Sequence, residues 1–125
     1  MKTAKIGYWI TTVIVALMMT YSAYAYLTQD AMEQAFHHLG FPSYFRVELA
    51  IAKLAGAVLL VSPVPARWKD LAYAGFLITF ISAFIAHTAS GDPLSYRLGP
   101  LVFLALLAVS YFTRQRLRRQ KIALA

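Results

Sequence analysis

The chain has no cysteine among its 125 residues. It therefore forms no disulfide, provides no thiolate ligand to a metal, and carries no CxxC redox pair. Any redox role would depend on a bound cofactor or on a partner protein. The sequence also has no Gly-rich phosphate-binding loop and no nucleophile motif, so it leaves open whether the protein is an enzyme.

Charged residues are scarce. Asp, Glu, Lys and Arg make up 14% of the chain, about half the share that is usual in soluble domains. Hydrophobic residues make up 60%, and the mean hydropathy is +0.59. This composition indicates a membrane protein. No linker, long polar tract or low-complexity run interrupts the chain, so we expect a single membrane domain over residues 1–125.

Acidic residues are fewer still, five against twelve Lys and Arg, which gives a net charge of +7. A strongly basic protein can bind nucleic acid, but here the basic residues flank apolar runs. Lys2 and Lys5 precede one such run, and five more lie in residues 114–121 after another. Basic residues in these places orient membrane helices. We therefore expect the lipid bilayer as the partner and no nucleic acid.

Four apolar segments predict four membrane-spanning helices. They cover about residues 6–27, 44–61, 68–87 and 97–113. The first has no charge over 22 residues, which is about 33 Å of helix, and the hydrocarbon core of a bilayer is about 30 Å thick. In the fourth, Pro100 lies near the expected start, where helical N–H groups lack intrahelical partners anyway.

The first segment also resembles a secretory signal peptide. It has a basic start, an apolar middle, and Ala23-Tyr24-Ala25 as an A-x-A cleavage site. Cleavage there would remove the first span and leave the orientation of the other three unchanged. Whether the segment is ever cleaved stays open, and the four-span interpretation is favoured because the rest of the chain is membrane-like.

A longer link joins the first two spans. Asp30 and Glu33 favour a helix start, and Gly40 followed by Pro42 ends the helix. The apolar residues between them recur at helical spacing. We therefore predict a short amphipathic helix over residues 29–39 that lies at the membrane interface or over the bundle.

The placement of Lys and Arg predicts the orientation. They gather before the first span, in the second loop at Arg67 and Lys69, and after the fourth span. Both termini are therefore expected in the cytoplasm, with residues 114–125 as a basic cytoplasmic tail. The predicted fold class is all-α, an integral membrane antiparallel four-helix bundle with a short interfacial helix between spans 1 and 2. Small residues at helical spacing, such as Ala52 and Gly56, let membrane helices approach closely.

Three charged residues interrupt the second span. Arg46 lies near its outer end, where we expect the side chain to snorkel to the headgroups. Lys53 lies about 13 Å along the helix, and a central Lys costs about 2.5–3.5 kcal/mol on insertion scales, so it should face the protein interior. Glu48 and Lys53 are five residues apart and project about 140° from each other, so they are not a default helical pair. The depth-matched partners for Lys53 are Thr20, Tyr21, Tyr24, Thr79 and Ser82.

For Glu48 the depth-matched partner is His87. The candidate ligand-binding residues are Glu48, Lys53, His87, His37, His38, Tyr24 and Asp92. Such a cluster can bind a polar headgroup, a quinone carbonyl or a proton, and it can equally pair internally and fix the helix register. No metal site is expected, because adjacent histidines project about 100° apart on a helix and no metal-ligand spacing is present. No catalytic residue is assigned.

Two stretches carry a family resemblance. They are "HHLGFPSYFRVELAIAKLAGAVLLV", residues 37–61, and "AFIAHTASGDP", residues 83–93, with a short proline loop after the first. With this arrangement the chain resembles the DoxX-like family of small four-helix bacterial membrane proteins, over about residues 6–112. The matching positions are Leu39, Gly40, Phe41, Pro42, Glu48, Lys53, Gly56, His87, Gly91 and Asp92.

The resemblance implies the bacterial cytoplasmic (inner) membrane and a link to quinone chemistry, because the family's namesakes are associated with a thiosulfate:quinone oxidoreductase. The first hypothesis is that the bundle binds a quinone or another lipophilic small molecule and serves a membrane redox system beside a redox partner protein. The alternative is a non-enzymatic membrane assembly factor or small subunit of a membrane complex, because distant relatives act as assembly chaperones. A homodimer stays open, and a transporter with four spans would require one.

Overall fold

The structure is a computed structural model that describes residues 2–124. Within this range the chain forms five α-helices and no strand. Their bounds are α1 Lys2–Thr28, α2 Asp30–His38, α3 Ser43–Val61, α4 Ala66–Ala89 and α5 Leu94–Leu124. The all-helical class predicted from the sequence is confirmed.

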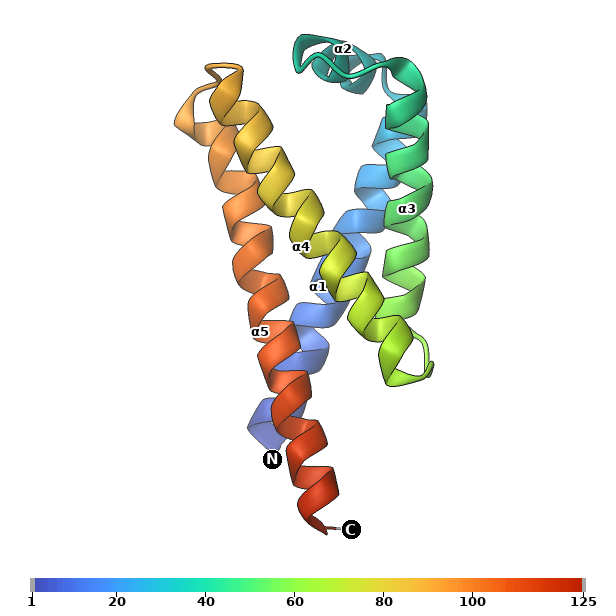
Figure 1. The fold of residues 1–125 in the computed structure, drawn as a ribbon, viewed down its shortest axis with the longest axis vertical. Helices are drawn as coiled ribbons and strands as arrows, with labels where there is room; N and C mark the ends of the chain where they lie inside the picture. Colours follow the sequence, from blue (N-terminus) through green and yellow to red (C-terminus); the bar gives the residue numbers. More distant parts are fainter. Residues whose placement is uncertain (1, 125) are drawn as a thin grey trace.

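The four long helices run alternately up and down (Figure 1). Helix α1 packs against α3 and α5, and α4 packs against α5 and α3, so each long helix has two neighbours of opposite direction. Both chain termini lie at one end, which we call the terminal end. The opposite end carries α2 and the α4–α5 turn, and we call it the α2 end.

The helix contacts follow a seam of buried residues three and four positions apart. In α1 these include Tyr8, Thr12, Val15 and Met19, and in α3 they are Ala50, Lys53, Ala57 and Leu60. This alternating spacing keeps one stripe of a helix against its neighbour. The seams meet in one core with residues from α4 and α5, among them Ala72, Tyr73, Phe76, Phe80 and Leu107.

Gly56 permits the close approach of α3 and α4. A Cβ at this position would lie 2.6 Å from Cζ of Phe76, so only glycine leaves room for the ring. The Phe76 ring stacks on Phe80, with centroids 5.8 Å apart, and Phe80 stacks on Phe103 of α5 at 5.6 Å. The glycine therefore admits the first ring of an aromatic stack that crosses from α3 to α5.

Both connections at the α2 end turn on a glycine with positive φ. Gly40 has φ of 86° and follows α2, and Gly91 has φ of 73° and follows α4. A left-handed residue after the last helical turn is a common helix stop. The predicted end of the linking helix at Gly40 is confirmed, and the observed α2, Asp30–His38, agrees with the predicted 29–39.

Helix α5 differs from the prediction at both ends. It begins at Leu94 and continues through the basic residues to Leu124, over 31 residues. Pro100 is therefore inside the helix and past its first turn, and the expectation that it lies where N–H groups are unpaired is wrong. The basic segment expected only as a tail is a helical extension, because nothing in residues 114–121 breaks a helix.

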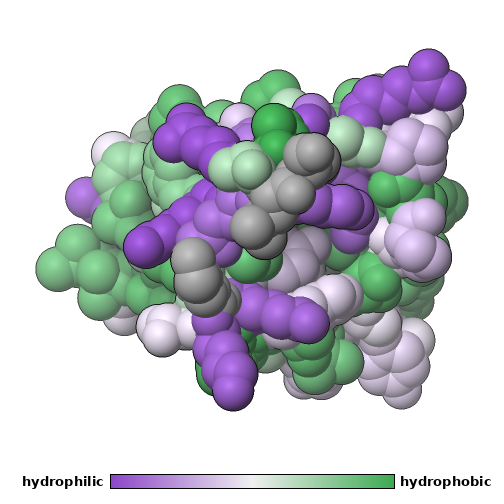
Figure 2. Space-filling model, turned by 90° about the horizontal axis from the view of Figure 1, so that it is seen from below, coloured by the Kyte–Doolittle hydropathy of each residue, from purple (hydrophilic) through white to green (hydrophobic). Residues whose placement is uncertain are grey.

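By length and composition, three helices can cross a membrane: α1, α4, and α5 over Leu94–Ala123. Helix α3 has 19 residues but carries Arg46, Glu48 and Lys53, and it is not among these three. The terminal end is strongly polar: seen from below, hydrophilic side chains gather across it, with apolar side chains around them (Figure 2).

Candidate functional site

Lys53 is a buried cation on α3 with only 6% of its surface exposed. Its Nζ donates hydrogen bonds to Ser22 Oγ at 2.9 Å and to Tyr26 Oη at 2.7 Å. The same nitrogen lies 4.0 Å from the centroid of the Tyr26 ring. Among residues 2–124, no carboxylate pairs with it. Two hydroxyl groups and an aromatic face therefore surround the ammonium, and two of its three N–H groups are engaged.

The predicted partners of Lys53 are wrong. Tyr21 and Tyr24 are exposed, and Thr20 and Thr79 each bond a carbonyl one turn back in their own helix. Ser22 and Tyr26 extend the buried spacing of α1 by further steps of three and four after Met19. That spacing was the signal in the sequence, and depth alone did not reveal it because depth does not specify a face.

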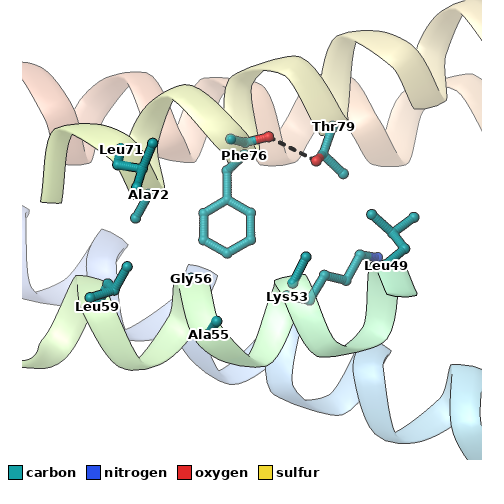
Figure 3. Close-up of a pocket in the computed structure, with 11 residues that line it drawn as sticks. Leu49, Lys53, Ala55, Gly56, Leu59, Leu71, Ala72, Phe76 and Thr79 are labelled. Carbon is teal, nitrogen blue, oxygen red and sulfur yellow. Dashed lines mark hydrogen bonds between the residues drawn. The ribbon is translucent and has the colours of Figure 1, made fainter. Parts of the chain in front are cut away.

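A groove of about 250 Å³ lies between α3 and α4 beside Lys53. Its lining is apolar except for Lys53 and Thr79. The Phe76 ring projects from α4 toward Gly56, and the Lys53 side chain runs along α3 toward Leu49 (Figure 3). The groove is lined by Leu49, Ala52, Lys53, Ala55, Gly56, Leu59, Leu71, Ala72, Gly75, Phe76 and Thr79.

Glu48 lies on the face of α3 that lines this groove. It lies four residues before Ala52 and seven before Ala55, and both of these line the groove, so the three form one stripe. The Glu48 side chain is exposed, and it makes no hydrogen bond or ion pair with any other described residue. The expected Glu48–His87 pair does not form, because His87 bonds Asp92 instead.

Asp92 joins α2 to the α4–α5 turn. Its Oδ1 accepts a hydrogen bond from His38 Nε2 at 2.9 Å, and its Oδ2 accepts one from His87 Nδ1 at 2.7 Å. An ionised carboxylate only accepts, so each histidine donates from the nitrogen named. Arg97 Nε donates to the Asp92 backbone carbonyl at 3.0 Å. We call His38, Asp92 and His87 the clasp, because they link elements on both sides of the α2 end.

The hydrogen bonds from His87 and then His38 hold the pKa of the Asp92 carboxyl below its ordinary value of 3.8, against a smaller opposing effect of burial. A carboxyl whose folded pKa is depressed stabilises the fold above its unfolded pKa, and this stabilisation is lost as the pH falls through the folded pKa. The clasp is therefore stable at neutral pH and acid-labile below 3.8.

Asp92→Asn is expected to lower the thermal unfolding midpoint at neutral pH, because Asn lacks the ionised carboxylate that both histidines bond. The gap between wild type and variant should close as the pH falls below 3.8, where Asp92 itself becomes protonated. Thermal scans of both proteins across this range measure the gap. A gap that persists in acid contradicts the role given to the Asp92 charge.

An aromatic cluster holds the other side of α2. Phe36 meets the Tyr26 ring edge to face at 4.8 Å, and Phe41 stacks on Phe45 at 4.9 Å. Arg46 donates from Nη1 to the backbone carbonyl of Tyr26 near the end of α1. The Arg46 guanidinium therefore also bonds a carbonyl at the end of α1, and its expected contact with the headgroups stays a prediction. Tyr26 contacts both Lys53 and the cluster beneath α2.

A second polar network lies nearer the terminal end, and the sequence reasoning missed it. The Ser110 hydroxyl lies 2.6 Å from Thr12 Oγ1 and 2.6 Å from Tyr73 Oη, so it joins α1, α4 and α5. Arg114, which is 7% exposed, donates to Asp70 Oδ1 at 2.8 Å. Ser110 and Arg114 are four residues apart on one face of α5, and this spacing was the available signal.

The structure thus assembles part of the predicted set. It joins His38, His87 and Asp92, and it buries Lys53 elsewhere on partners from α1. His37 is exposed, and Tyr24 is 61% exposed and turned away from Lys53's partners. Within residues 2–124, no three His, Asp or Glu side chains are placed to hold a metal ion.

Three long apolar helices and a buried lysine held by hydroxyl groups define a small helical membrane protein. The chain belongs to the DoxX-like family, whose sequence model matches residues 10–110. The matched range contains the groove, Lys53 and the clasp. No curated protein and no solved structure matches the chain.

Proposed function

We propose that α3 is a fourth membrane span and that both termini are cytoplasmic, in a bacterial inner membrane. Its 19 residues reach about 28 Å, close to the thickness of a hydrocarbon core. The packing of α3 between α1 and α4 supports this. So do its charges: Lys53 faces α1, Arg46 bonds the end of α1, and Glu48 lies within about 8 Å of the helix start, near the interface.

We propose further that the groove between α3 and α4 binds a lipophilic small molecule with a carbonyl group, such as a quinone. The observation that carries this is the combination of an apolar groove of about 250 Å³ with a buried ammonium that has one N–H left unbonded by the protein. A carbonyl oxygen accepts from such a donor, and hydrogen bonds to charged groups are stronger than neutral ones.

The size of the groove limits the ligand. Pockets for drug-sized ligands usually measure about 300–1,000 Å³, so this groove holds a ring or headgroup while a longer tail lies between helix faces and lipid. Glu48, at the outer edge of the same stripe, would meet a hydroxyl or another donor on the ligand. The chain has no cysteine, so electrons would pass between the ligand and a redox partner protein.

The test is binding of decylubiquinone to the purified protein in nanodiscs, compared with decylbenzene, which has the same tail and no carbonyl. Lys53→Met should weaken quinone binding by about ten- to hundredfold, because it removes a charged donor worth about 1.5–3 kcal/mol. Lys5→Met, an exposed lysine at the terminal end, is the matched control. Equal binding to wild type and Lys53→Met would overturn the proposal.

The same substitution should not destabilise the protein. A central lysine costs about 2.5–3.5 kcal/mol in a membrane helix, and its partners are the neutral hydroxyl groups of Ser22 and Tyr26, so its removal leaves no unpaired charge behind. Lys53→Met is therefore expected to keep or raise the thermal midpoint in detergent. A clear loss of stability would mean that Lys53 serves mainly to pair α3 with α1.

A second candidate, a non-enzymatic assembly factor or small subunit, is favoured by a different surface. A groove of about 340 Å³ lies between α4 and α5, and a partner helix would pack there. It is lined by Asp70, Tyr73, Ala74, Leu77, Leu104, Leu107, Ala108, Tyr111 and Phe112. Mass spectrometry after purification in mild detergent separates the two candidates: a stoichiometric protein partner supports this one, and a copurified small molecule supports the first.

A further inference from the structure

The terminal end carries a concentrated positive charge with almost no compensating acid. Lys2, Lys5 and Arg67 are exposed there, as are four residues of the α5 extension. These four are Arg116, Arg118, Arg119 and Lys121. The one carboxylate in this part of the sequence, Asp70, is held by Arg114 at 2.8 Å. The remaining cations are therefore available to an anion from outside the described chain.

The basic ends of α1 and α5 lie side by side. The two helices are antiparallel neighbours, and a Cβ on Gly7 would lie 3.7 Å from Thr113 Cγ2. The residues before Gly7 thus run alongside the residues after Thr113. Figure 2, which views this end from below, shows the resulting gathering of hydrophilic side chains.

The charges of the α5 extension surround the helix. At about 100° per residue, Arg118, Arg119 and Lys121 lie about 200°, 300° and 140° around the axis from Arg116. Their Cα atoms lie about 5–12 Å beyond Thr113 along the helix. The headgroup layer adds about 5–8 Å to each side of the hydrocarbon core. Basic residues on all sides of the helix at this depth fit a surrounding layer of headgroups. An acidic protein partner would instead favour basic residues along one side of the helix.

The positive charges of the α5 extension also destabilise the helix that carries them. Arg116 and Arg119 are three residues apart, as are Arg118 and Lys121, and like charges at this spacing destabilise a helix. Anions placed around the helix would relieve that repulsion. Phosphates of anionic lipids supply such charges in the cytoplasmic leaflet, and juxtamembrane basic residues bind them.

We propose that the terminal end binds anionic lipid headgroups, and that these headgroups keep the α5 extension helical. The partner is the anionic phospholipid of the surrounding leaflet. The proposal does not depend on the groove beside Lys53 or on any ligand bound there.

The experiment is amide hydrogen exchange of the full chain in nanodiscs of phosphatidylcholine alone or with about one third phosphatidylglycerol. Residues 114–124 should exchange about tenfold more slowly in the anionic discs, while residues 101–109 of the same helix exchange equally in both. Raising the salt to about 1 M, where the Debye length is about 3 Å, should remove the difference.

Two variants make the test specific. The combined Arg116→Gln, Arg118→Gln, Arg119→Gln and Lys121→Gln variant should lose the lipid dependence and keep the exchange pattern of α1 to α4, which shows that it folds. Arg97→Gln, a basic residue at the α2 end of the same helix, should keep the lipid dependence. Equal exchange of residues 114–124 in both kinds of disc would overturn the proposal, as would protection that appears only with a copurified acidic protein.

Discussion

Replacing Gly56 with valine should lower the free energy of unfolding by about 1–3 kcal/mol, the range expected when a packed core is overfilled. A Cβ at this position meets the Phe76 ring at 2.6 Å. The Phe76 ring is 4% exposed and stacked on Phe80, so a shift away from the new side chain breaks this stacking and moves the ring into the groove that it lines. The expected result is a lower midpoint in mixed-micelle unfolding, together with loss of the proposed quinone binding as the displaced ring enters the groove.

Gly75→Val is the matched control, since Gly75 lines the same groove from α4 and a Cβ there meets nothing within 4 Å. It should leave stability nearly unchanged. Phe76→Leu added to Gly56→Val should restore part of the lost stability, because the smaller side chain yields the space that valine needs. Additive effects of Gly56→Val and Phe76→Leu would contradict a direct contact between the two positions.

Ser110→Ala is expected to lower the free energy of unfolding by about 1–3 kcal/mol, the cost of leaving buried polar groups without partners. Ser110 is 1% exposed, and its hydroxyl lies 2.6 Å from both Thr12 Oγ1 and Tyr73 Oη. Its removal leaves two buried hydroxyl groups without the bond that joined three helices. Equilibrium unfolding in mixed micelles measures the loss.

Ser82→Ala serves as the control, because Ser82 is exposed on α4 and its substitution should leave the free energy of unfolding unchanged. Tyr73→Phe combined with Ser110→Ala should cost less than the sum of the single variants, since the second change removes one of the stranded hydroxyl groups. A Ser110→Ala protein as stable as wild type would show that water or lipid reaches this network.

Much of the architecture could be predicted because it depends on local chemistry. Apolar runs of sufficient length and the glycines at positions 40 and 91 define where helices run and stop. The burial of Lys53 could be predicted because a charge in an apolar helix has no stable exposed state in lipid. The end of α5 could not be placed this way, since the apolar run stops after Phe112 whereas the helix continues to Leu124.

The partners could not be predicted by the same reasoning. Lys53 was assigned to residues of matching depth, and the true partners, Ser22 and Tyr26, lie at that level on a specific face of α1. In a soluble helix, polar residues mark the outer face, whereas in α1 both faces are apolar, so hydropathy does not indicate which one meets α3. Glu48 and His87 were paired by depth, and a turn with positive φ at Gly91 brought Asp92 to His87 instead.

The sequence by itself determined the membrane class, the absence of thiol chemistry, the approximate extents of the helices, and that the Lys53 side chain must be buried in the protein. Only the tertiary structure decided which helix meets Lys53, that Asp92 joins His38 to His87, that Ser110 joins three helices, and that Gly56 admits Phe76 beside a groove. The physical reason is that composition and local spacing set what each helix needs, whereas the rotation and crossing of neighbouring helices set which groups meet that need.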